Sequence, residues 1–265
     1  MLVFLAAAAL AGGLTVGSAL DVSPDRWSRA GQTVVKFGRN PSCGTTTEDV
    51  WLGGDTFTGW LTAAASIRVA SGGNAADTAA GAGCREVTFE CLDSEWDTVT
   101  QSVATAGASA SSAGATTCIR VQRAWCSAVG TYTGANTGAM TIETTGGTVV
   151  AVIAAGGGQT QQTMYTVPDG YRAWVTGGTV SVDATGSNVS RMRFWQRRDA
   201  DDVSAPYAGT KRVAFDFDGV KGMNPDKLTV WSGPFPARTD LWASCTGSAN
   251  VAISVHYEMI LEPVP

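Results

Sequence analysis

Short runs in which apolar and polar residues alternate recur along most of the chain. In the first half these runs are "SIRVAS" (66–71), "CREVTFECL" (84–92), "WDTVTQSVA" (96–104), "CIRVQRAWC" (118–126), "GAMTIET" (138–144) and "TVVAVIAA" (148–155). In the second half they lie within 163–182, 191–198, 211–219, 227–233, 240–245 and 250–262. A period of two places neighbouring side chains on opposite faces of a strand. The pattern therefore predicts half-buried strands in antiparallel sheets.

Turn residues separate these runs, and no long amphipathic helical pattern follows residue 30. In "PDG" (168–170), proline presets the first central φ of a turn, and the Asp-Gly pair tolerates the next position. We predict an all-β fold of one or two antiparallel β-sandwiches, of jelly-roll or immunoglobulin-like type. The predicted organisation is an apolar arm or helix (1–20), an extended linker (21–44), a first β domain (45–150) and a second (151–265).

The N-terminal segment 2–20 carries no charge and is long enough to cross a bilayer. A retained secretory signal is one interpretation, but no basic residue precedes Arg26. A membrane anchor is a second interpretation, and it also lacks flanking basic residues. We favour a third, an arm packed against other copies or neighbouring proteins, because alanine and glycine permit close backbone approach. The candidate contact residues are Leu2, Val3, Phe4 and Leu5.

Charge excludes one class of partner. Charged residues make up only 15% of the chain, and the net charge is −5. The densest basic stretch, 191–198, alternates like a strand and reads as a solvated face or an interface. We therefore expect no nucleic-acid partner, which would require a basic surface.

The six cysteines predict disulfides more readily than a metal site. No pair has C-x-x-C spacing and the chain has one histidine, which disfavours zinc. If runs 84–92 and 118–126 are antiparallel neighbours, Cys84 lies opposite Cys126 and Cys91 opposite Cys118. Small buried free cysteines are the alternative. Cys43 lies in the irregular arm and is the candidate for a bond to another chain.

No pattern of catalytic residues is present. His256 sits in an alternating run without a GxSxG elbow, so a structural or surface role is favoured over catalysis. Asp216 and Asp218 alternate with phenylalanines as on an exposed strand, and EF-hand spacing is absent. We predict no catalytic residue, no metal and no cofactor, and hence no enzyme.

Nine tryptophans require an explanation. Most lie in or beside predicted strands, which favours a place in the sandwich core. The alternative is a sugar-binding platform or an interface with aromatic anchors. The interface candidates are Trp51, Trp60 and Trp195, the last of which is set among arginines.

Several blocks resemble a family of virion structural proteins of tailed bacteriophages, common in marine and soil phages. These blocks are "GRNP" (38–41), "TTEDVWLGG" (46–54), "AADTAAG" (75–81), "GANTGAMTI" (134–142) and "GQTQQTMYTVPDGYRAWV" (158–175). "TTEDVW" and "AADTAAG" are the specific ones, and the resemblance covers about residues 38 to 182. The cysteines and the apolar arm depart from the family pattern. Within "AADTAAG", Asp77 and Thr78 are expected to bond local backbone.

The resemblance implies a structural role and no catalytic residues. We expect a capsid decoration or head–tail collar protein, located in the virion and assembled in the host cytoplasm. Its partners would be major capsid or neck proteins and further copies of itself, with a trimer favoured. A receptor- or glycan-binding fibre or spike is the alternative. A secreted hydrolase that uses His256 is a third, disfavoured hypothesis.

Overall fold

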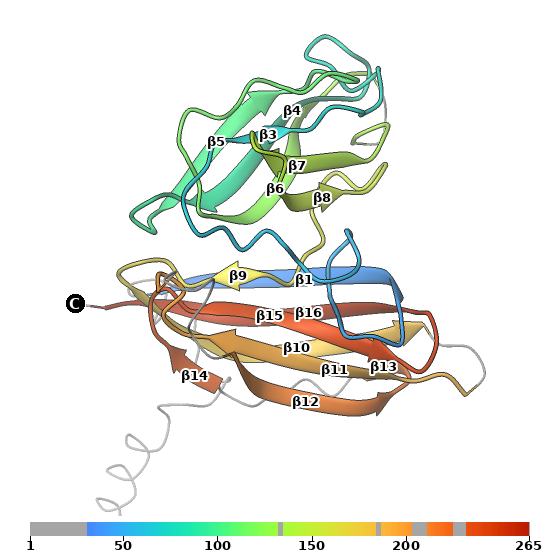
Figure 1. Ribbon diagram of the computed structural model, residues 1–265, viewed down its shortest axis with the longest axis vertical. Coiled ribbons are helices and arrows are strands. Elements are labelled where there is room, and N and C mark those ends of the chain that lie inside the picture. The colour runs from blue at the N-terminus through green and yellow to red at the C-terminus, as the bar shows by residue number, and fades with distance from the viewer. Residues whose placement is uncertain (1–30, 132–134, 184–186, 203–210, 225–231, 265) are drawn as a thin grey trace, which may run out of the picture.

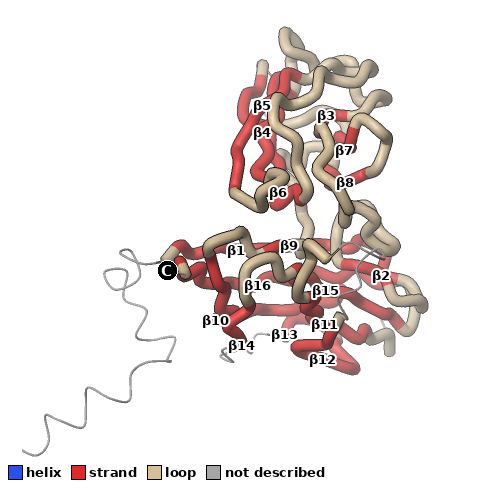
Figure 2. The backbone as a smooth tube through the Cα atoms, turned by 60° about the vertical axis from the view of Figure 1, so that its left-hand side comes forward, coloured by secondary structure: helices blue, strands red, loops and turns tan. Residues whose placement is uncertain are grey.

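The computed structural model describes residues 31–131, 135–183, 187–202, 211–224 and 232–264. These residues form strands and loops without any helix, which confirms the predicted all-β class. Figure 1 shows two lobes stacked one above the other, and Figure 2 shows that loops, not strands, cross between them. The predicted arm, 1–20, lies outside the described residues.

The small lobe is a sandwich of two three-stranded antiparallel sheets, β5-β4-β6 and β3-β7-β8. Its strands are β3 (Ile67–Val69), β4 (Cys84–Leu92), β5 (Thr98–Ala104), β6 (Arg120–Val129), β7 (Met140–Thr144) and β8 (Val149–Ile153). The apolar faces of the two sheets enclose one core, in which Phe89, Ile142 and Ile153 are fully buried. Burial of these alternate side chains is what the period of two in the sequence predicts.

The large lobe is a sandwich of two five-stranded sheets. One has the order β1-β16-β10-β13, with β14 also on β10, and the other has the order β12-β11-β15-β2, with β9 also on β15. The first sheet contains β1 (Gln32–Cys43), β10 (Tyr171–Asp183), β13 (Gly222–Asn224), β14 (Ser232–Phe235) and β16 (Val251–Pro263). The second contains β2 (Glu48–Asp49), β9 (Tyr165–Thr166), β11 (Ser190–Arg197), β12 (Arg212–Val220) and β15 (Asp240–Gly247). Apolar side chains of both sheets, among them Phe194 and Met259, share one core.

The first described strand lies beside the last one. β1 pairs with β16 along nearly its whole length, from Gln32 opposite Leu261 to Cys43 opposite Val251. Residues 32–43 are therefore a sheet strand, although the sequence predicts them as part of an extended linker. The apolar alternation of β1 is hidden because its buried face carries Lys36, Gly38 and Asn40 in place of large hydrophobic residues.

The small lobe is inserted between two strands of the large lobe. β2 lies on β15 of the large lobe, the chain then builds β3 to β8, and β9 returns to β15. The boundary predicted near residue 150 falls inside β8 of the small lobe. The glycine-rich stretch 154–162 follows β8 and leads back to the large lobe.

Three disulfides join strands within the lobes, and the described residues contain no free cysteine. Cys84–Cys126 and Cys91–Cys118, each with 5.8 Å between Cα atoms, connect β4 to β6 or its preceding residues, as predicted. The prediction for Cys43 is wrong, because Cys43 is bonded to Cys245 of the same chain. Cys43 is the last residue of β1 and is fully buried in the core, so its sulfur is not accessible to another chain.

Removing the Cys43–Cys245 bond should destabilise the large lobe. The two residues are separated by 202 positions, so the bond restricts the unfolded chain strongly. We expect the double variant Cys43→Ala/Cys245→Ala to lose about 2–5 kcal/mol of unfolding free energy, measured by urea denaturation. On a non-reducing gel the wild type should migrate as a single chain. A covalent dimer abolished by Cys43→Ala would contradict this assignment.

Candidate functional site at the junction between the lobes

The irregular stretch after β2 is a strap that connects the lobes. Residues 50–61, here called the strap, run along β15 toward the small lobe, starting with a hydrogen bond from the Val50 amide to the Ala243 carbonyl (2.9 Å). Asp49 fixes the fold of the strap because its carboxylate accepts the amide of Phe57 at 2.8 Å. The turn between them uses left-handed backbone at Gly54 (φ 62°) and Asp55 (φ 58°).

The strap contributes three aromatic rings to a cluster at the junction. Trp51 meets Phe57 edge-to-face with ring centroids 5.0 Å apart, and Phe57 meets Trp60 at 5.1 Å. Trp60 in turn contacts Trp242 of β15 at 5.3 Å. Met164 completes the buried part of the cluster. Trp51 and Trp60, predicted as contacts to other subunits, therefore pack inside their own chain.

Trp195 forms the outer end of the same cluster. Its ring stacks on Trp242 with centroids 6.2 Å apart, and its Nε1 donates to Ser244 Oγ at 2.7 Å. The ammonium of Lys211 lies 4.9 Å from the ring centroid. Trp195 is half-buried, so only part of the ring remains accessible for the predicted role at an interface.

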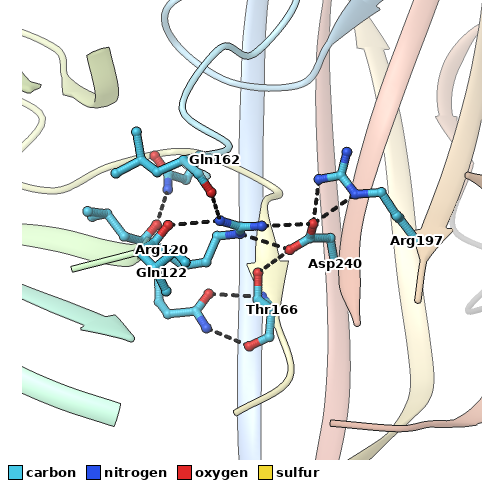
Figure 3. A network of polar contacts seen from close by, with 9 residues as sticks. Arg120, Gln122, Gln162, Thr166, Arg197 and Asp240 are labelled. Atoms are coloured by element: carbon cyan, nitrogen blue, oxygen red, sulfur yellow. Dashed lines mark hydrogen bonds and ion pairs between the residues drawn. The ribbon is translucent and has the colours of Figure 1, made fainter. Parts of the chain in front are cut away.

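A buried carboxylate connects the lobes beside this cluster (Figure 3). Asp240 begins β15, where its neighbours across the sheet are Arg197 of β11 and Thr166 of β9. Thr166 Oγ1 donates to Asp240 Oδ1 at 2.6 Å, and Arg197 Nε donates to Oδ2 at 3.0 Å. From the small lobe, Arg120 at the start of β6 donates through Nε (3.0 Å) and Nη2 (3.2 Å). Both lobes thus bind one carboxylate.

The charges explain why Asp240 stays ionised. Burial by itself would raise the pKa of Asp240, but the guanidinium groups of Arg120 and Arg197 outweigh it, so the pKa lies below its ordinary value. The faces of indole rings lie next to both arginines. Arg197 Cζ is 4.9 Å from the centroid of Trp60, and Arg120 Cζ is 5.0 Å from that of Trp96. Such faces attract cations, so the aromatic cluster and the ion network stabilise each other.

The side chains of two glutamines add hydrogen bonds to backbone groups at the junction. Gln122 of β6 donates to the Thr166 carbonyl (2.6 Å) and accepts the Thr166 amide (3.0 Å). Gln162 donates to the Val121 carbonyl at 2.9 Å, and Lys36 of β1 donates to the Gln122 carbonyl. Hydrogen bonds depend on the angle between their groups, and each lobe contributes both donors and acceptors to this set. The arrangement fixes the orientation of one lobe on the other.

Two ionisable groups at the junction have displaced pKa values. Burial lowers the pKa of Lys36 to about 7, which Glu90 partly offsets and Arg123 reinforces. Burial raises the pKa of Asp49 to about 6, although its bond to the Phe57 amide acts in the opposite direction. Both groups form structural hydrogen bonds, Lys36 with the Gln122 carbonyl and Asp49 with the Phe57 amide.

The blocks of the phage resemblance form strands and the loops beside them: "GRNP" lies within β1, and the last block contains β9 and the start of β10. In "GRNP", Asn40 Nδ2 donates to Glu48 Oε2 of the "TTEDVW" block at 2.8 Å. In "AADTAAG", buried Asp77 accepts the amides of Cys84, Thr137 and Gly138, each at 2.8 Å. The first of these bonds is the local backbone contact expected of Asp77. The other two connect this block to "GANTGAMTI", which the sequence alone did not indicate.

The remaining predicted positions do not assemble a reaction centre. His256 lies on β16 with 37% of its side chain exposed, and Cys245 is unable to act as its thiol partner because it is bonded to Cys43. Asp216 pairs with Arg191 and Arg193 on the surface of the large lobe. Within the described ranges, no group of three or more His, Cys, Asp or Glu residues is placed to hold a metal ion.

Sequence reasoning missed the ion network. The alternation of "CIRVQRAWC" places Arg120 and Gln122 on one strand face, opposite Ile119 and Val121. A polar strand face is usually solvated, and only the inserted position of the small lobe turns this one toward Asp240. Two features of the sequence could have indicated a buried ion network: the polar strand face of Arg120 and Gln122, and the nine tryptophans of the chain.

Comparison of the chain with protein-family models, with curated proteins and with solved structures finds no match in any of the three. Separately, the described part of the chain contains no helix long and apolar enough to cross a membrane.

Neutralising Asp240 should destabilise the junction. Asp240→Asn leaves two buried guanidinium groups without their carboxylate, and we expect a loss of about 3–5 kcal/mol in unfolding free energy, measured by urea denaturation. The matched control is Asp216→Asn, because Asp216 also lies between two arginines but at the surface, where little change is expected. Equal stability of the two variants would refute the role assigned to Asp240.

The stability contributed by Lys36 should depend on pH. Its pKa falls from 10.5 to about 7 in the folded chain, so between these values the unfolded chain holds a proton that the folded chain lacks. Unfolding free energy therefore rises with pH across this window. We expect the wild type to gain stability relative to Lys36→Met between about pH 7 and about pH 9.5, measured by urea denaturation. A difference that is independent of pH would contradict the burial of this ammonium.

Proposed function

We propose that the protein is a structural component of a bacteriophage particle, a capsid decoration or head–tail collar protein that stabilises or extends the shell. The sequence blocks that resemble phage virion proteins support this proposal. In the structure, residues of these blocks form contacts that hold each lobe in shape, as with Asn40 bonded to Glu48 and Asp77 bonded to Gly138. A family defined by its place in a particle is expected to use its characteristic residues in this way.

The observation that carries the proposal is the construction of the junction. The junction contains three buried charged side chains, Asp240, Arg120 and Arg197, whose ion pairs join the two lobes. Three internal disulfides add resistance to unfolding in an oxidising environment outside a cell. A rigid body of this kind suits a protein that bears load in an assembly, and we propose no catalytic activity for it.

The proposed partners are major capsid or neck proteins and further copies of the chain, with a trimer favoured. β1 and β12 end the two sheets of the large lobe. Each carries an exposed valine, Val35 at 47% and Val213 at 42% exposure. Edge strands with apolar side chains are natural places for contact with a neighbouring subunit. The proposed arm residues Leu2 to Leu5 lie outside the described residues.

A receptor- or glycan-binding spike is the second candidate. The structure offers one specific observation in its favour, an open groove beside Trp125 in the small lobe. Trp195, which the sequence predicts as an interface aromatic, is half-buried against Trp242.

The proposed function is tested on purified particles. Mass spectrometry of phage particles banded in a density gradient should detect this chain in stoichiometric amounts, and labelled antibodies should locate it on the capsid or collar by electron microscopy. Native mass spectrometry of the recombinant chain should show a trimer. Particles that lack the chain would overturn the proposal, whereas a monomer in solution would remove only the predicted oligomeric state.

A further inference from the structure

An open groove of about 400 Å³ lies on the small lobe, and none of its lining residues belongs to the ion network of Asp240. It lies where β4 and β6 meet the glycine-rich stretch that follows β8. The lining residues are Glu90, Arg123, Trp125, Cys126, Gly157, Gly158 and Gln159. This volume is within the range of about 300–1,000 Å³ that small-molecule sites occupy.

Strand register brings the polar groups of the groove together. Glu90 of β4 lies directly opposite Arg123 of β6, and Trp125 is two residues further along β6. Residues two apart on a strand share a face, so the indole and the guanidinium lie on the same side of the sheet. Gln159 forms a β-bridge with Trp125, and its Oε1 accepts from Arg123 Nη2 at 2.7 Å.

Glycine makes the wall of the groove. The Cys126 amide donates to the Gly158 carbonyl at 2.8 Å, so the chain after β8 lies against β6. Gly158 has a φ of +68°, and a Cβ at this position would lie 2.7 Å from the Cβ of Ala135. A residue with a side chain would be strained here and would displace the wall. The groove is therefore a product of this glycine-rich sequence.

The side chains that line the groove match the chemistry of a sugar. An indole ring packs against the C–H face of a pyranose, and its amphipathic character suits a site that is half wet. Glu90 accepts hydrogen bonds from hydroxyl groups, Arg123 donates them, and Gln159 does both. Arg123 would attract a phosphate or another anion, but Glu90 beside it offsets this attraction, and the net charge of −5 also disfavours nucleic acid.

Arg123 Cζ lies 5.9 Å from the centroid of the Trp125 ring, so the guanidinium covers part of that ring. We propose that this groove binds a neutral saccharide, with one pyranose ring against the remaining part of the Trp125 ring and its hydroxyl groups between Glu90, Arg123 and Gln159. A neutral ligand is assigned because Glu90 and Arg123 contribute opposite charges to the same groove. This binding activity deepens the second candidate function, receptor or glycan binding, and is independent of the proposed structural role.

The experiment uses the full chain on a microarray of bacterial and plant oligosaccharides, followed by titration calorimetry with the bound sugars. We expect binding to at least one neutral oligosaccharide. Trp125→Ala should weaken it by at least about tenfold, as for a central aromatic contact, and Glu90→Gln should weaken it less. The matched control is Trp195→Ala, because Trp195 is also half-buried but lies in the large lobe, and its loss should leave affinity unchanged.

Three outcomes would overturn the proposal: no bound oligosaccharide on the array, exclusive binding of acidic sugars, or unchanged affinity in Trp125→Ala. If Trp125→Ala fails to fold, as judged by circular dichroism, Glu90→Gln and Gln159→Ala provide the same test with polar side chains. The presence of the chain in particles is measured separately by mass spectrometry. Failure of sugar binding therefore leaves the proposed structural role intact, and the reverse also holds.

Discussion

The arrangement of the whole molecule depends on the buried carboxylate of Asp240. Its hydrogen bonds reach Arg197 and Thr166 within the large lobe and Arg120 in the small lobe. Removing the three charged groups of Asp240, Arg120 and Arg197 from water costs free energy. Their mutual attraction offsets that cost only while every partner is in place. A slight rotation of one lobe would separate Arg120 from the carboxylate. The network therefore opposes alternative orientations of the lobes more strongly than a purely apolar contact would.

Aromatic packing stabilises the buried charges of this network. Trp60 and Trp96 place indole faces beside the two arginines, and Trp60 comes from the strap that follows β2. The strap itself begins at Asp49, whose carboxylate holds the Phe57 amide. The irregular threonine-, glycine- and tryptophan-rich stretch near the start of the chain thus has a physical purpose. It brings rings from the large lobe to the base of the small lobe, where they exclude water from the ion pairs.

Much of the fold was predictable because local alternation determines it. The run 84–92 forms β4 within the same limits, and the cysteines at the ends of two neighbouring strands form the predicted disulfides. The errors have a common cause, which is polar or small side chains on buried faces. The sequence predicts β1 as linker because Lys36 and Asn40 occupy its inner face, and the assignment of Cys43 to an irregular arm has the same origin.

The junction could not be predicted, because it depends on contacts between residues that are distant in the sequence. Arg120 and Asp240 are separated by 120 positions, and neither sequence context marks a charge as buried. The same ambiguity affects tryptophan, for which the sequence favours the core and leaves a sugar-binding platform or an interface as alternatives. Trp51 and Trp60 belong to the junction, whereas Trp125 borders an open groove.

One combination of side chains thus appears twice in this molecule with different consequences. At the junction, indole, guanidinium and carboxylate are enclosed between lobes, satisfy one another and confer rigidity. Beside Trp125, the same three groups line a groove that is open to solvent, which is the proposed saccharide site. Burial alone separates the two cases, because buried partners are fixed by the fold while exposed ones keep capacity for an additional hydrogen bond. The sequence therefore shows which side chains are available to this protein. The insertion of the small lobe between β2 and β9 determines which of them stabilise the fold and which line the groove.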